Sequence, residues 1–179
     1  HRPETRVKLG YDSLALYLIF HIEDRYVRAE QTEDQNEICQ DSCVEIFFTP
    51  GSDPSQGYFN LETNCLGVRL MRFQTAPEKN KTLIRPVHLE MIETYASMSG
   101  GITTEITDPV VWSVQHRIPL AALTPYTRVV EPAPGISWRA NFYKCADSSS
   151  HPHWLCWAPI TTGQFSYHAP DCFGELQMV

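Results

Sequence analysis

Three short stretches of the sequence place planar polar side chains at alternating positions. Glu45 stands between the apolar residues Val44 and Ile46, so it is expected to point away from the core that these neighbours fill. Two further stretches carry a polar residue at every second position, namely Asn60, Glu62 and Asn64, and then Arg139, Asn141 and Tyr143. Carboxylate, amide and guanidinium groups can each make paired hydrogen bonds with neighbouring hydroxyls. Each residue alone could be structural, but together they favour a ligand rich in hydroxyl groups.

Aromatic residues near the carboxyl end could add the flat surface that packs against the C–H face of a sugar ring. Trp154 and Trp157 lie three positions apart on one expected strand, so they should face opposite sides of it. We expect one of them in the core and assign Trp157 as the stacking platform. Tyr167 and His168 come shortly before the last expected strand and are further candidates.

The spacing of cysteines and histidines does not indicate a metal or catalytic centre. The six cysteines match no zinc-binding pattern, and they could be buried free thiols or form disulfides. His116 lies on an apolar strand face and is interpreted as a hydrogen-bonded core residue. There is no Gly-x-Ser-x-Gly elbow, phosphate-binding loop or dinucleotide fingerprint, and no obvious carboxylate pair for glycoside hydrolysis. We therefore expect a protein that is not an enzyme.

An acidic stretch, Glu30–Asp41, is the one candidate for a cation site. It holds enough carboxylate oxygens for calcium, with Glu33, Asp34 and Asp41 as the candidate ligands. The spacing matches no defined calcium loop, and a solvated acidic loop is the alternative.

Short strands separated by prolines and glycines must position these side chains. Strand patterns are found at Leu14–Ile22, Cys43–Thr49, Gly57–Asn64, Leu66–Phe73, Val87–Met91, Val111–Ile118, Ile136–Cys145, Trp154–Ala158 and Phe173–Val179. A helical turn is expected only at Ile118–Leu123, which Pro125 soon ends. About ten short strands with little helix predict an all-β fold, an antiparallel β-sandwich. No repeat or linker divides residues 1–179, which we interpret as a single domain.

Composition narrows the classes of ligand. The net charge of −7 comes without a basic stripe, which disfavours nucleic acid, and a neutral ligand such as a sugar is compatible with it. No run of 18 apolar residues is present, so no membrane insertion is expected. No signal-peptide pattern is visible after His1, and this end of the sequence does not indicate a compartment or an oligomeric state.

Several motifs, in order and spacing, resemble those of the family 9 carbohydrate-binding modules, most closely a bacterial subgroup. The segments that carry the resemblance are Gln40–Phe48, Tyr58–Gly67, Trp112–Val114, Ile118-Pro119, Arg139–Cys145, Pro152–Ile160, His168–Pro170 and Phe173–Leu176. Arg139–Cys145 followed by Pro152–Ile160 is the most specific part, and the whole set covers nearly all of the chain. The resemblance implies a jelly-roll-like sandwich that recognises sugar chains or chain ends without cleaving them. It also favours an extracytoplasmic location and implies structural calcium in some relatives.

The resemblance also implies a set of binding residues. Glu45 matches a ligand-contacting glutamate, and a sugar-binding arginine is expected near Arg69, with Arg72 as the competing position. The expected ligand-binding residues are Glu45, Asn60, Arg69, Asn141, Trp157 and His168. One departure concerns residues 36–39, Asn-Glu-Ile-Cys, which contain no aromatic where the family places a tryptophan. That absence puts a clamp of two tryptophans around one sugar ring in doubt.

Two alternatives to sugar binding follow from the same residues. Related sandwich domains bind haem through methionine and histidine, and Met71, Met91, Met98 and His88 are available for this. A structural or interaction domain that has lost its ligand is the other alternative, and the missing aromatic before Asp41 favours it.

Overall fold

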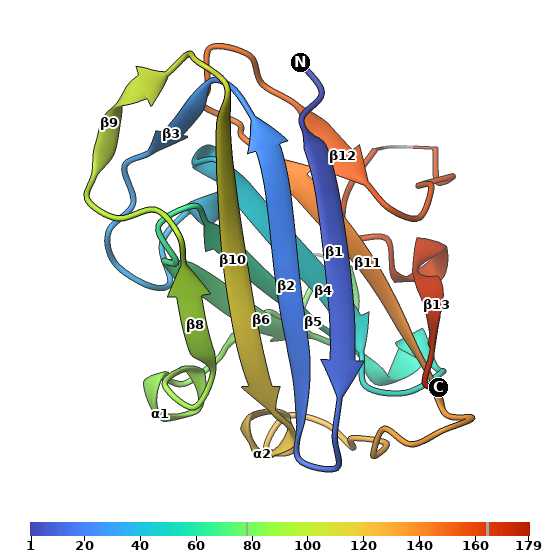
Figure 1. Ribbon diagram of the computed structural model, residues 1–179. Coiled ribbons are helices and arrows are strands. Elements are labelled where there is room, and N and C mark those ends of the chain that lie inside the picture. Colours follow the sequence, from blue (N-terminus) through green and yellow to red (C-terminus); the bar gives the residue numbers. More distant parts are fainter. Residues whose placement is uncertain (78, 164) are drawn as a thin grey trace.

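Two antiparallel sheets pack face to face in the computed structural model, which describes residues 1–77, 79–163 and 165–179 (Figure 1). The smaller sheet has the strand order β1 (Glu4–Tyr11), β2 (Ala15–Asp24), β10 (Val110–Pro119), β8 (Glu93–Ala96). The larger sheet has the strand order β12 (Trp154–Cys156), β11 (Ser137–Cys145), β4 (Cys43–Thr49), β5 (Tyr58–Asn64), β6 (Arg69–Gln74), β7 (Thr82–Leu83). Outside this order, β13 (Gly174–Gln177) also pairs with β11. Strands β3 (Val27–Ala29) and β9 (Ile102–Ile106) form a separate pair. The predicted antiparallel β-sandwich is confirmed.

The core lies between the two sheets because each strand turns alternate side chains inward. Val44, Ile46 and Phe48 on β4 are buried in it, and Phe20 and Trp112 reach it from the opposing sheet. The residues between them on β4 therefore face outward from the larger sheet. This arrangement gives Glu45 the orientation that the alternation predicts.

In the described residues, helical structure is confined to single turns. These are η1 (Ile38–Gln40), η2 (Pro54–Gln56), α1 (Pro86–Leu89), α2 (Leu120–Leu123) and η3 (Pro170–Cys172). The predicted turn before Thr124 is confirmed as α2. The strand predicted over Val87–Met91 is wrong, because Pro86 begins a helical turn and the amide of Leu89 bonds back to the carbonyl of Arg85. Within the described residues, no helix has the length and apolar character needed to span a bilayer.

The described residues form thirteen strands, more than the ten or so expected. The five that the sequence patterns did not indicate are β1, β3, β7, β8 and β9. The first of these is long, and its inward positions Val7, Leu9 and Tyr11 pack against the core. Their alternation with Lys8 and Gly10 was the signal that could have identified it.

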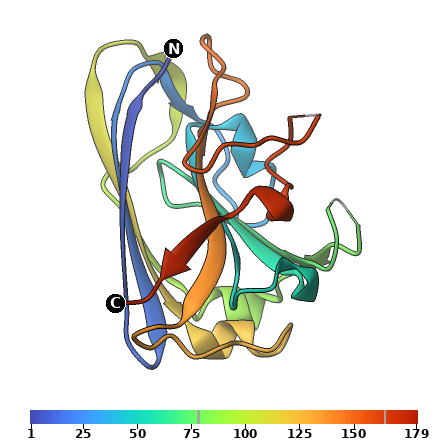
Figure 2. The same cartoon turned by 90° about the vertical axis from the view of Figure 1, so that its right-hand side faces the viewer.

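The outer face of the larger sheet is covered in part by the chain between β12 and β13. Figure 2 shows η3 and its flanking chain on the side of this sheet away from β1, β2 and β10. Phe173 packs there against Phe47, Tyr58 and Tyr143. We call residues 165–173 the outer-face cover, because they lie over the side chains that the sequence singled out.

Candidate functional site

Strand register brings polar residues from four strands into neighbouring rows on the outer face of the larger sheet. One row runs across β11, β4, β5 and β6 as Asn141, Phe47, Asn60 and Arg72. The next row runs as Tyr143, Glu45, Glu62 and Leu70. Paired residues of an antiparallel sheet share a face, so three of the expected ligand residues, Glu45, Asn60 and Asn141, lie on the same face.

A chain of hydrogen bonds joins several of these side chains beneath the cover. The Asn60 amide donates to Glu62 Oε1 at 2.9 Å, and Gln74 Nε2 donates to Asn60 Oδ1 at 2.9 Å. His168 completes the chain from the cover, since its Nδ1 lies 2.8 Å from the Tyr58 hydroxyl and 3.2 Å from Gln74 Nε2. His168 thus meets the sheet at the place expected of it, and Tyr58 and Gln74 are partners that the sequence did not reveal.

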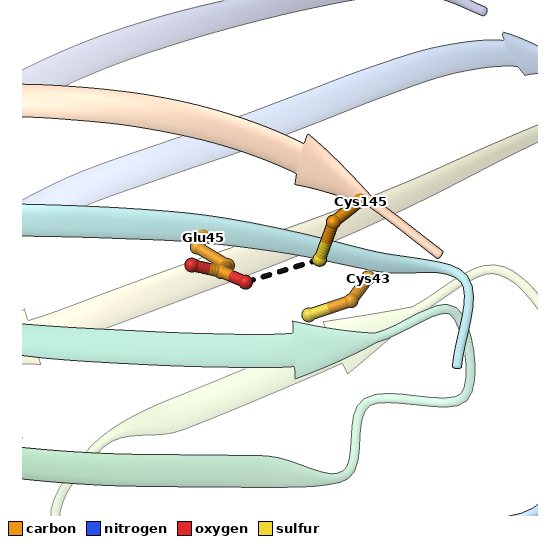
Figure 3. A group of neighbouring side chains, drawn as sticks. All are labelled: Cys43, Glu45 and Cys145. Atoms are coloured by element: carbon orange, nitrogen blue, oxygen red, sulfur yellow. Dashed lines mark hydrogen bonds between the residues drawn. The ribbon is translucent and has the colours of Figure 1, made fainter. Parts of the chain in front are cut away.

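Glu45 is enclosed at the floor of this face, with 2% of its surface exposed. The Cys145 thiol donates to its Oε1 at 3.1 Å, and Cys43 lies beside them (Figure 3). Burial, with the nearby charge of Glu62, raises the pKa of Glu45 well above that of a free carboxyl. Burial also raises the pKa of Glu62, to about 7, although the Arg72 guanidinium opposes this.

Asn141 has a different task from the one expected. Its Oδ1 accepts hydrogen bonds from the amides of Ala158 and Phe142 at 2.8 and 2.9 Å, and its Nδ2 donates to the Ala158 carbonyl at 3.0 Å. The side chain is fully buried. Asn141 therefore anchors the chain after β12 to the sheet, and it does not present its amide to the surface.

Arg69 is not brought together with the other expected ligands. Its register partner is Thr63, which faces the opposite side of β5 from Asn60. The guanidinium donates to the carbonyls of Leu89 and Ile92 and pairs with Asp34 at 2.7 Å. Arg72, the competing position, is the arginine that shares the outer face.

The two tryptophans face opposite sides of the chain at β12, as expected, but the expectation that one is in the core is wrong. Trp154 is 51% exposed and Trp157 is 52% exposed. Trp154 pairs with Cys145 and so lies on the side of Glu45, whereas Trp157 packs edge-on to the core residue Phe142, with 5.6 Å between ring centroids. Trp157 lines a groove between β1 and β12, and Trp154 also contributes to its lining.

Three acidic side chains lie near one another on the outer face and form a cluster that we call the acidic niche. We define it by Glu45, Glu62 and Asp147, whose negative charges together with burial raise the pKa of the half-buried Cys39 thiol. Trp154 borders the niche, because its indole N–H donates to Asp147 Oδ1 at 2.8 Å. Cys39 stands at the position where the sequence lacks the expected aromatic.

Tyr167 closes the niche from the cover. Its ring stacks on Tyr143 with 3.9 Å between centroids, and its hydroxyl donates to the carbonyl of Leu155 at 3.1 Å. The Tyr143 hydroxyl in turn donates to the Tyr167 carbonyl at 3.0 Å. These contacts fix the cover against the sheet and leave the edge of Tyr167 half-buried at the rim.

The acidic stretch does not fit a calcium site. Asp41 accepts hydrogen bonds from the amides of Glu30 and Gln31 and from Asn64 Nδ2, so both of its oxygens are engaged with protein donors. Asp34 accepts hydrogen bonds from the backbone amide and the guanidinium of Arg69, and Glu33 is exposed to solvent. Calcium needs six or more converging oxygens, and these carboxylates serve the loop itself.

The haem alternative gains no support from its residues. Both ring nitrogens of His88 are engaged, one with Arg85 and one with the Tyr126 hydroxyl, and Met71 is enclosed in the core. His116 is also a buried core histidine, as interpreted, bonded to Thr63 and Thr94. The six cysteines are free thiols in the described part of the chain.

Comparison with known proteins identifies the family. The family model described as carbohydrate-binding family 9 matches residues 1–178. The fold is similar to that of a candidate carbohydrate-binding protein from Bacteroides uniformis, with a TM-score of 0.88 and 28% identity over 99% of this chain and 79% of the other. No curated protein matches.

Two structures of a family 9 module from Caldicellulosiruptor kristjanssonii are also similar. The one in complex with glucose has a TM-score of 0.62 and 17% identity, over 99% of this chain and 77% of the other. The one in complex with cellotriose has a TM-score of 0.65 and 18% identity, over 99% of this chain and 75% of the other. At these identities the likeness establishes a common sandwich fold. Because the family model spans all but the last residue, this chain belongs to carbohydrate-binding family 9.

Proposed function

We propose that the chain binds a saccharide without cleaving it, at the acidic niche on the outer face of the larger sheet. The observation that carries the proposal is the convergence of planar polar groups from adjacent strands on one face of the sheet, near a half-exposed indole ring. The family relationship and the glucose and cellotriose complexes of the Caldicellulosiruptor module support the same ligand class.

Hydrogen bonds to sugar hydroxyls come from Glu62 and Arg72, which are neighbours across β5 and β6 and differ in charge. Asn60 holds the Glu62 carboxylate in place through its 2.9 Å hydrogen bond, and His168 borders the same network. A preorganised pair of this kind loses little side-chain entropy when a ligand binds. Glu45 lies deeper and shapes the floor.

Trp154 supplies the stacking surface in this proposal. Its ring is half exposed on the side of Glu45, and the hydrogen bond to Asp147 limits its rotation. Trp157, the platform expected from the sequence, belongs instead to the groove beside β1. Both indoles contribute to this groove, but Trp154 is on the outer face of the sheet and Trp157 packs against the core residue Phe142, so the two variants distinguish the two faces.

Binding without hydrolysis is proposed because of how the two glutamates are placed. Glu45 and Glu62 are direct partners on β4 and β5, and they project from the same side of the sheet. Glycosidases hold their two carboxyl groups on either side of the scissile bond. A pair side by side on one floor cannot do this, so incubation with an oligosaccharide should release no new reducing ends.

Isothermal titration calorimetry with glucose and cellotriose tests the location. Glu62→Gln should weaken binding about tenfold or more, because it removes a charged acceptor worth about 1.5–3 kcal/mol. Trp154→Ala should also weaken binding by roughly tenfold, through loss of ring stacking worth about 1 kcal/mol and of buried apolar area. Trp157→Ala is the matched control and should leave affinity unchanged.

Two results would contradict the proposal. Loss of binding in Trp157→Ala with normal binding in Trp154→Ala would move the ligand to the groove beside β1. A broad glycan array with no signal for the unaltered protein would remove the saccharide function and leave a structural domain.

A further inference from the structure

Two cysteines and a glutamate meet beneath the niche, contributed by neighbouring strands. Cys43 and Glu45 lie on β4, and Cys145, the direct register partner of Cys43, lies on β11. The two thiol sulfurs and a Glu45 oxygen all lie within 4.8 Å of one another, and Figure 3 shows the three side chains directed toward a common point. The residues are 0%, 1% and 2% exposed. A carboxyl buried this completely loses its hydration and needs partners within the protein.

The charges around this set favour a cation. Glu62 and Asp147 are the acidic neighbours of Glu45 on the outer face. Lys144, the nearest basic residue along β11, turns to the other face, where its ammonium lies 2.8 Å from His153 and 3.3 Å from Asp24. The Lys144 ammonium is therefore held near these two residues on the other face. The Glu45 carboxyl accepts its hydrogen bond from a thiol.

We propose that Cys43, Cys145 and Glu45 bind a thiophilic divalent cation, with Zn²⁺ as the natural candidate. Zinc binds thiolate sulfur at about 2.3 Å and carboxylate oxygen at about 2.0–2.2 Å, which places tetrahedral ligand atoms roughly 3.3–3.8 Å apart. The observed separations are comparable, with 3.1 Å between Cys145 Sγ and Glu45 Oε1 and at most 4.8 Å within the set. Soft sulfur ligands select zinc over calcium or magnesium.

Cys39 borders this set at its more accessible side and marks the route of entry. It is half-buried and its carbonyl lies 3.9 Å from Cys145 Sγ, but its thiol is not one of the three groups that lie within 4.8 Å of one another. Binding exchanges protons for metal, since each coordinating thiol gives up its proton to solvent as the sulfur–metal bond forms. A single cation therefore releases at least two protons.

This inference does not depend on the proposed saccharide function. The metal would lie under the sugar-binding surface and share only the Glu45 side chain with it. The two functions are measured separately, because metal binding is observed through thiolate absorbance and sugar binding through calorimetry.

A titration of the reduced full chain with Cd²⁺ alone, a spectroscopic stand-in for Zn²⁺, tests the site. We expect an ultraviolet thiolate-to-metal charge-transfer band that saturates at one equivalent, accompanied by proton release in weakly buffered solution. Zn²⁺ should displace the Cd²⁺ and abolish the band. Cys43→Ala and Cys145→Ala should each weaken Cd²⁺ binding at least a hundredfold, and Cys39→Ala should leave the two-thiolate band in place.

Cys172→Ala is the matched control, because Cys172 is a free thiol beside Thr161 and is not one of the three clustered groups. It should bind Cd²⁺ like the unaltered protein. Circular dichroism confirms that each variant folds, and Glu45→Gln, which preserves side-chain volume, should lower affinity without removing the band. An absent band in the reduced protein, or one unchanged in both Cys43→Ala and Cys145→Ala, overturns the metal site. Either result leaves the saccharide titration unaffected.

Discussion

At the scale of single residues, His116 shows how the sandwich treats a polar side chain that it buries. Its ring nitrogens lie 3.1 Å from the Thr63 hydroxyl and 3.0 Å from the Thr94 hydroxyl, so it joins the two sheets by hydrogen bonds. Burial, with the nearby Arg69 charge, lowers the pKa of His116 to about 3. The ring is therefore neutral in the folded protein at neutral pH.

This pKa predicts a loss of stability in acid. Between pH 6.5 and about 3 the unfolded chain binds a proton at His116 that the folded chain does not, so the free energy of unfolding falls as pH falls through that window. The slope from this residue approaches about 1.4 kcal/mol per pH unit. Urea unfolding at pH 7 and pH 4.5 should show a smaller decrease for His116→Gln than for the unaltered protein.

The decrease in the free energy of unfolding is compared between the unaltered protein and His116→Gln, so the contributions of the other titrating groups cancel. Glu45 and Glu62, whose pKa values are raised, act in the opposite direction and are present in both. Equal decreases in the two proteins would mean that His116 is not the group responsible.

Residue roles were predictable from sequence where alternation alone decides them. The outward direction of Glu45 and Asn60 follows from their apolar neighbours on β4 and β5, and the structure shows it. The choice between Arg69 and Arg72 depends on the register across the turn after Asn64, which alternation does not fix. The cluster of Cys43, Glu45 and Cys145 was beyond sequence reasoning, because a strand pairing joins residues about a hundred positions apart.

At the scale of elements, the connection between η2 and β5 depends on a glycine. Gly57 has φ of +94°, and a Cβ there would lie 2.5 Å from the Phe73 ring and 2.7 Å from the Gln74 carbonyl oxygen. Gly135 has a similar φ of +86°, but a Cβ there would meet nothing within 4 Å. Comparing substitutions at the two glycines therefore separates the cost of backbone strain from the cost of steric conflict.

Alanine at the two positions should therefore have unequal costs. Gly135→Ala should lower the free energy of unfolding by about 1 kcal/mol, from the left-handed backbone alone. Gly57→Ala should lower it by roughly 2–5 kcal/mol, since backbone strain and overpacking add. Urea denaturation measures both, and equal losses would show that Phe73 moves aside freely.

Elements were predicted well where apolar alternation is long and less well where they are short. The strand β4 has the predicted bounds, β5 and β11 differ from prediction by one residue at one end, and β10 by one residue at each end. At α1 the alternation of Val87, Leu89 and Met91 resembled a strand, but Pro86 began a helical turn that buries Leu89 and leaves Val87 and Met91 exposed. A period-two pattern over five residues does not distinguish the two structures.

At the scale of the whole molecule, a buried ion pair links the two sheets. Lys144 on β11 is 1% exposed, and its Nζ lies 3.3 Å from Oδ2 of Asp24 at the end of β2. The contact is an ion pair more than a directed hydrogen bond, because the donor bonds of Nζ go to the Cys145 carbonyl and the His153 ring. The regular pairing of β11 with β4 continues through Lys144, so the lysine enters the core without a bulge.

A double-mutant cycle measures how far this pair holds the sheets together. Lys144→Met should lower the free energy of unfolding by about 3–5 kcal/mol, because it removes the ammonium beside the buried Oδ2 of Asp24, which accepts no hydrogen bond from the described residues. Asp24→Asn should also destabilise, since it leaves the ammonium without a counter-charge, although the asparagine can still accept from the Arg25 amide. The double variant should be less destabilised than the sum of the two by about 1–3 kcal/mol. Urea unfolding of the four proteins at pH 7 gives the coupling energy directly. Additive losses would mean that the two charges are stabilised by their own hydrogen bonds, and that apolar packing alone joins the sheets at this edge.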